Sequence, residues 1–158
     1  FDTASDAEVL VTRPRDVTDN AVPSGSSLAV ELLAILGDVF DVPLYRERAS
    51  RVLEGLVEPM ARYPTAFGHA LGATDMVVRG AVEVALPGTS GLAAAVADEY
   101  APSLVLVGGA ASSDLALMAG RAEGLGYVCR SYSCEKPTAD AGELREQLRG
   151  ARRSSSGG

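Results

Sequence analysis

Hydrophobic residues recur at helical spacing through the first half of the chain. In the stretch 28–39, leucine, isoleucine and valine return every three or four residues, and Ser24 stands where an N-cap is expected. Additional apolar residues widen this stripe until little of the helix surface is polar, which predicts a mostly buried helix. A second helix is predicted over 45–57 with Asp41 as its N-cap, and a third begins after Pro64.

After Arg79 the spacing of apolar residues changes from helical to alternating. Residues 82–86 alternate as in a strand, and 104–107 form the continuous apolar run of a strand that is covered on both faces. A strand–helix–strand connection of this length predicts a parallel pair. Residues 127–130 are a third candidate strand, and Asp140 is the expected start of a final helix.

The change of pattern predicts three parts and a mixed α/β fold. These are a helical region at 1–78, a small parallel α/β unit at 79–150, and a polar tail at 151–158 that is expected to be disordered. The helices carry more apolar surface than a small sheet can cover. We therefore expect them to pack on more helices of a longer chain, or on a second copy of this one. The first residue, Phe1, also favours a piece of a longer polypeptide.

Composition narrows the function classes. The formal net charge is −7 and the pI is about 4.7, which argue against nucleic-acid binding through bulk charge. No apolar run is long enough to span a membrane, and a signal peptide is not recognised, so we expect a cytoplasmic protein. The one histidine excludes a zinc site that needs two imidazoles, and no metal or cofactor is predicted.

The most informative segment is the turn before the first helix. Asp19, Asn20, Ser24 and Gly25 bring a carboxylate, an amide and a hydroxyl to a helix N-terminus, where free N–H groups favour an anion or the oxygens of a polyol. The same residue types are also the usual components of a turn with an N-cap. The four residues are therefore candidate ligand-binding residues, with a purely structural turn as the alternative.

Two other features leave alternatives open. Glycine-rich turns at 88–91 and 108–113 follow strands, where ligands often bind, but the nucleotide-binding glycine motifs are absent. Cys129 and Cys134 lack the C-x-x-C spacing of redox pairs, and a zinc ion would need two more ligands. Their sulfurs meet if the chain folds back between them; otherwise both are small buried hydrophobic residues, the interpretation that we favour. His69 is expected to be structural.

Two segments of the chain resemble a known family. They are Asp-Asn-Ala-x-Pro-Ser-Gly at 19–25 and Tyr-Val-Cys-Arg at 127–130 with Cys134, supported by Phe-Asp-Thr at 1–3 and Arg-Pro at 13–14. In these the chain is similar to the C-terminal portion of thioredoxin domain-containing proteins of the YyaL and spermatogenesis-associated protein 20 type. The resemblance extends from Phe1 to about Leu148. A departure is Ser26, where the family usually has asparagine.

The resemblance implies a place and a role for each part of the chain. The helices would be the last hairpins of an (α/α) toroid like that of N-acylglucosamine 2-epimerases and six-hairpin glycosidases, and the α/β unit would be an appendage. The toroid and a thioredoxin-like domain upstream would be its partners, the turn at Asp19 would lie near a carbohydrate-binding cavity, and this part alone would not be catalytic. The alternatives are a non-enzymatic module that docks through its apolar helix face, and a small ligand-binding α/β domain.

Overall fold

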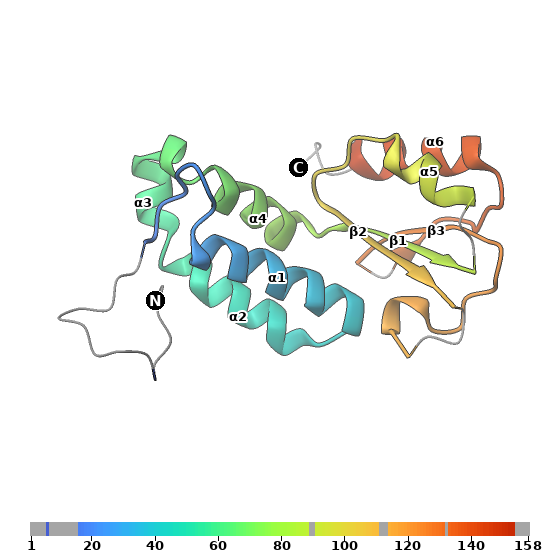
Figure 1. The fold of residues 1–158 in the computed structure, drawn as a ribbon, viewed down its shortest axis with the longest axis horizontal. Coiled ribbons are helices and arrows are strands. Elements are labelled where there is room, and N and C mark those ends of the chain that lie inside the picture. Colours follow the sequence, from blue (N-terminus) through green and yellow to red (C-terminus); the bar gives the residue numbers. More distant parts are fainter. Residues whose placement is uncertain (1–5, 7–15, 89–90, 111–113, 132, 154–158) are drawn as a thin grey trace.

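The chain folds into a helical half followed by an α/β half. The computed structural model describes residues 6, 16–88, 91–110, 114–131 and 133–153. Helices follow one another from Gly25 to Arg79, and a single sheet with two covering helices comes next (Figure 1). The fold is therefore mixed α/β, as predicted. Among the described residues, no helix has both the length and the apolar character needed to cross a membrane.

Four α-helices make up the helical half, and a short 3-10 helix, η1 (Pro64–Ala66), precedes the last of them. They are α1 (Gly25–Phe40), α2 (Pro43–Glu54), α3 (Val57–Arg62) and α4 (Gly68–Arg79). The short connection between α1 and α2 makes them antiparallel neighbours, and α4 lies on another side of α1 (Figure 1). Their shared core contains Val30, Ala49, Leu53, Phe67 and Ala70.

The predicted burial of α1 is wrong in one important respect. Its buried face carries Ser27, Val30 and Ala34, whereas Leu28 and Leu32 are 47% and 56% exposed. The small side chains allow α2 and α4 to approach α1 closely, and this leaves the larger leucines on the opposite side. A leucine stripe alone therefore did not identify the packed face.

Close packing also explains a glycine inside α1. A Cβ at Gly37 would lie 2.8 Å from Cγ of Arg46 on α2. Ser24 is the N-cap of α1, as predicted, and accepts a hydrogen bond from the backbone N–H of Ser27. Asp41 does not cap the second helix; it ends α1 in the left-handed conformation, with φ of 54°, and Val42 precedes α2.

The sheet has the strand order β2-β1-β3-β4. Strands β1 (Val82–Pro87) and β2 (Leu104–Gly109) are parallel, which confirms the predicted pair. Strands β3 (Tyr127–Arg130) and β4 (Ser133–Cys134) follow, and β3 is antiparallel to β1. The prediction of a parallel unit is thus wrong for β3, because β3 starts beside the carboxyl end of β1, at the same edge of the sheet where β2 ends.

Both faces of the sheet are covered. Helices α5 (Gly91–Ala97) and α6 (Ala141–Arg153) lie on one face (Figure 1), where Val84, Val96, Leu144 and Leu148 are among the buried residues. The other face packs against α1, α4 and the short 3-10 helix η2 (Ala116–Met118). The sheet therefore belongs to a core shared with the helical half.

Two boundaries follow from these elements. Gly80 and Ala81 alone separate α4 from β1, and Gly80 has a positive φ of 78°. The change of pattern near Val78 thus coincides with the junction between helices and sheet. Helix α6 runs through Arg153, so the predicted disordered tail at 151–158 is wrong for residues 151–153, and its remainder lies outside the described residues.

Candidate functional site

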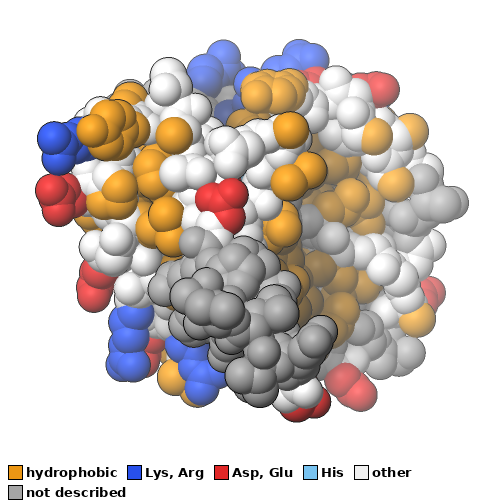
Figure 2. Space-filling view, turned by 60° about the vertical axis from the view of Figure 1, so that its left-hand side comes forward, with side chains coloured by type: hydrophobic (Ala, Val, Ile, Leu, Met, Phe, Trp, Pro, Cys, Tyr) orange, Lys and Arg blue, Asp and Glu red, His pale blue; other side chains and the backbone are white. Residues whose placement is uncertain are grey.

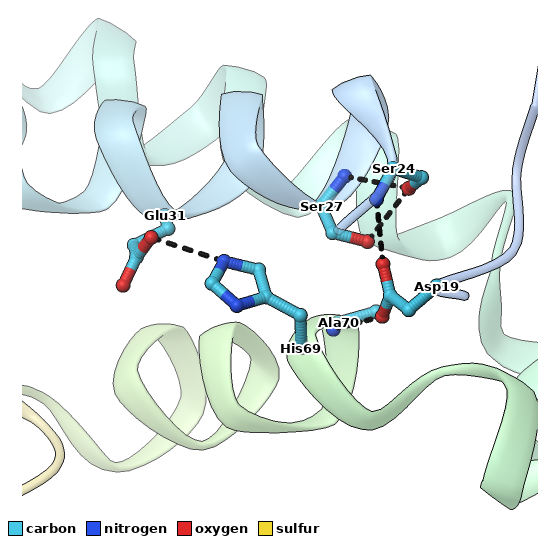
Figure 3. Close-up of polar contacts among 6 residues, drawn as sticks. All are labelled: Asp19, Ser24, Ser27, Glu31, His69 and Ala70. Atoms are coloured by element: carbon cyan, nitrogen blue, oxygen red, sulfur yellow. Dashed lines mark hydrogen bonds and ion pairs between the residues drawn. The ribbon is translucent and has the colours of Figure 1, made fainter. Parts of the chain in front are cut away.

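The carboxylate of Asp19 joins the starts of two helices. One oxygen accepts a hydrogen bond of 2.9 Å from the backbone N–H of Ser24, and the other accepts one of 2.8 Å from the backbone N–H of Ala70 on α4 (Figure 3). Partial burial alone would raise the pKa of Asp19, but these N–H donors outweigh it and lower the pKa. Asp19 thus fixes the position of one helix start relative to the other.

The hydroxyl groups of the turn bond mainly to each other. The side-chain oxygens of Ser24 and Ser27 are 2.8 Å apart, and both residues are buried (Figure 3). This is the structural N-cap that was the alternative to a ligand site. Asn20 is exposed, and its amide donates to Asp16 rather than joining Asp19. Gly25 is exposed at the start of α1.

The four candidate residues of the turn therefore have different roles. Asp19 and Ser24 lie together with Ser27, and both Asp19 oxygens accept backbone hydrogen bonds. Asn20 and Gly25 reach the surface beside them. Of the four, only Asn20 and Gly25 are exposed to solvent.

A histidine–carboxylate pair lies next to this turn and was not foreseen from the sequence. Nε2 of His69, on α4, is 3.0 Å from Oε2 of Glu31, on α1 (Figure 3). The side chains are 29% and 36% exposed. Because Asp19 holds the N–H of Ala70, it also fixes the backbone that carries the neighbouring His69. The partners are 38 positions apart in the sequence, which explains why no local motif revealed them.

The two cysteines are bonded to each other. Cys129 and Cys134 are directly opposite on β3 and β4 and form a disulfide. Cys129 is buried, as favoured from the sequence, but Cys134 is exposed. The interpretation of both as small buried hydrophobic residues is therefore wrong, because the chain folds back between them into a hairpin.

An arginine contacts both sulfurs of the disulfide. The guanidinium of Arg121 lies 3.2 Å from Sγ of Cys129 and 3.5 Å from Sγ of Cys134. Desolvation by burial lowers the pKa of Arg121, while Tyr127 and the buried Glu83 oppose that change. A guanidinium at this distance would stabilise a thiolate after reduction. No sequence motif includes Arg121, so its role could not be predicted.

The glycine-rich turns border a third region. A pocket of about 540 Å³ at the carboxyl ends of β1 and β2 is lined by apolar residues and by Gly88, Gly108 and Gly109. Parts of both turns, residues 89–90 and 111–113, lie outside the described residues. The only evidence from the described residues for the ligand-binding role predicted for these turns is therefore this apolar pocket lining.

Comparisons with known proteins and a search for metal ligands do not identify the site. No protein-family model, curated protein or solved structure matches the chain. Within the part of the chain that the structure describes, no group of three or more His, Cys, Asp or Glu side chains could hold a metal ion.

Proposed function

We propose that this chain is the C-terminal part of a larger thioredoxin domain-containing protein with a six-hairpin toroid and a carbohydrate-related function. In this proposal α1, α2 and α4 belong to the end of the toroid, and the sheet is an appendage. The residues near the starts of α1 and α4 contribute to a carbohydrate site, and the chain is not catalytic alone. The resemblance at 19–25 and 127–130 supports the lineage.

The observation that carries the carbohydrate site is the pair formed by His69 and Glu31. Its two side chains reach the surface between α1 and α4 and hold each other at 3.0 Å (Figure 3). An imidazole oriented by a carboxylate can donate to or accept from the hydroxyl groups of a sugar. Asp19 acts as a positioning residue, because it fixes the backbone beside His69.

The single histidine makes this proposal testable on the chain itself. The chain has one histidine, so its ring signals in an NMR spectrum are unambiguous. We expect N-acetylglucosamine to shift these signals in a saturable way, and Glu31→Gln to weaken the effect several-fold. Arg48→Gln, an exposed change on α2, is the matched control and should leave the titration unchanged. A ring signal that does not move at any sugar concentration would contradict the site.

The exposed leucines of α1 favour a second candidate function, a docking module without catalysis. Leu28 and Leu32 are one helical turn apart and about half exposed. Figure 2 shows hydrophobic side chains reaching the surface between charged ones on the side where the helices come forward. The expected partner is another helical hairpin of the parent protein, with self-association as the alternative.

Sedimentation at micromolar concentration tests the docking candidate. If the leucine stripe binds a second copy, the wild-type chain should be dimeric and Leu32→Glu should be monomeric with unchanged helix content. A monomeric wild-type chain would contradict self-association. Binding of the parent protein's upstream helices should then be lost in Leu32→Glu, and equal binding by wild type and variant would contradict the docking role.

A further inference from the structure

A pocket of about 390 Å³ lies at the junction between the helical half and the sheet. Its walls come from the end of α4, the loop before β2, the end of β3 and the end of α6. The lining includes five arginines, namely Arg79, Arg130, Arg149, Arg152 and Arg153. None of them belongs to the residues singled out for the carbohydrate site.

The charge in this pocket is opposite to that of the whole chain. Five of the 14 basic residues of a chain with net charge −7 line one cavity. Two nearby carboxylates pair with three of them: Asp75 lies 3.2 Å from Arg79, and Glu99 lies 2.6 Å from Arg149 and 3.9 Å from Arg152. Five guanidiniums against these two carboxylates leave an excess of three positive charges. Such an excess in a confined cavity attracts a multivalent anion.

One arginine has a donor that no described residue satisfies. Nη1 of Arg130 donates a hydrogen bond of 2.9 Å to the backbone oxygen of Arg79. Its Nε is buried and has no hydrogen-bond partner in the described part of the chain. Buried donors are almost always paired, so this N–H is an exception among the described residues.

The remaining walls suit a small organic molecule. Tyr100, Ala101 and Pro102 contribute an aromatic ring and apolar surface, and the Arg152 guanidinium lies 5.9 Å from the ring centre of Tyr100. The hydroxyl of Ser103, which also lines the pocket, hydrogen-bonds to Asp75 at 3.3 Å. A cavity of this volume is within the range of small-molecule sites and is larger than a phosphate ion needs.

We propose that this pocket binds the phosphate group of a small phosphomonoester. Guanidinium groups bind phosphate oxygens in a bidentate manner, and a dianion matches the excess of positive charge. The apolar wall at Tyr100 and Pro102 would contact the organic part of the ligand. This inference does not depend on the carbohydrate proposal, because the two sites share no residue.

Calorimetric titration of the full chain at low ionic strength tests the proposal. The probes are inorganic phosphate, glucose 6-phosphate and glucose. We expect glucose 6-phosphate to bind more tightly than inorganic phosphate, and glucose to give no binding here. Arg130→Gln and Arg153→Gln should each weaken binding about tenfold, consistent with the loss of one charge-assisted hydrogen bond. Arg153 is an exposed residue near the end of α6, so its substitution leaves the fold intact.

Arg48→Gln removes an equal charge from a distant exposed position on α2 and should bind like the wild type. Equal affinities for inorganic phosphate and glucose 6-phosphate would support the phosphate site but assign it to the free ion. The absence of binding by both phosphate probes would overturn the proposal. Equal losses in Arg153→Gln and Arg48→Gln would do so as well.

Discussion

The carboxylate of Asp19 accepts a hydrogen bond of 2.8 Å from the backbone N–H of Ala70, 51 residues further along the chain. The same carboxylate binds the N–H of Ser24, so a single side chain joins the starts of α1 and α4. A negative charge is favoured there because helix N-termini present unpaired N–H groups and the positive end of the helix dipole. Asp19 therefore contributes to stability independently of any ligand.

Removal of the Asp19 carboxylate should destabilise the fold. Asp19→Ala leaves two N–H groups without their acceptor, and we expect a loss of about 2 kcal/mol in the free energy of unfolding. Urea denaturation followed by circular dichroism measures this loss. Asn20→Ala is the neighbouring control and should cost much less, because Asn20 is exposed and its amide donates to the side chains of Asp16 and Thr18 at the surface. Equal losses in the two variants would contradict the bridging role.

The same contact predicts a pH dependence of stability. The pKa of Asp19 is lower in the folded chain than its ordinary value of 3.8. The unfolded chain thus takes up a proton first, and the stability supplied by Asp19, fully present above about pH 4, is lost as the pH falls through its folded pKa. The stability difference between wild type and Asp19→Asn should therefore shrink in acid. A constant difference between pH 6 and pH 2 would argue against this linkage.

Two glycines give a matched pair of stability tests. Gly37→Ala places a Cβ 2.8 Å from Cγ of Arg46, whose guanidinium is paired with Asp38, and should cost about 1–3 kcal/mol. Gly72→Ala on α4 meets nothing within 4 Å and should stabilise the helix by about 0.5–1 kcal/mol. Thermal unfolding of both variants checks the opposite signs. Similar shifts in both would show that α1 and α2 do not pack this closely.

After reduction of the disulfide, the two thiols should be alkylated at different rates. Cys134 is exposed and Cys129 is buried, so we expect Cys134 to be alkylated first after reduction. Arg121 contacts both sulfurs, and Arg121→Gln should slow alkylation because the thiolate loses its nearby positive charge. Mass spectrometry of time-quenched samples measures both rates. Faster alkylation in the variant would indicate that Arg121 shields the sulfurs rather than activating them.

The sequence predicted where the helices and strands lie along the chain better than which face of each helix is buried. Periodicity located α1, α2 and α4 because apolar residues recur along each helix. It missed the buried face of α1, where Ser27 and Ala34 permit close approach and the leucines remain outside. It also missed the direction of β3, because the spacing of apolar residues does not show at which edge of the sheet a strand begins.

The candidate site was only partly predictable for a related reason. The turn motif predicted Asp19 and Ser24 as candidate residues, because they lie within one turn of the chain. Glu31 and His69 meet only after α4 packs on α1, and each residue alone is typical of a helix surface. The arginine pocket likewise collects residues from four elements, so neither net charge nor any short motif indicates it. Tertiary packing, rather than local preference, creates these sites.

The short connection through Gly80 has a consequence for the arginine pocket. Only two residues connect α4 to β1, so the connection between the helical half and the sheet is short. Arg79 lies on one side of that joint and Arg130 on the other, and their side-chain-to-backbone contact spans it. Any molecule held between them would contact both halves of the fold, and slower amide exchange in both halves at once would indicate that it binds.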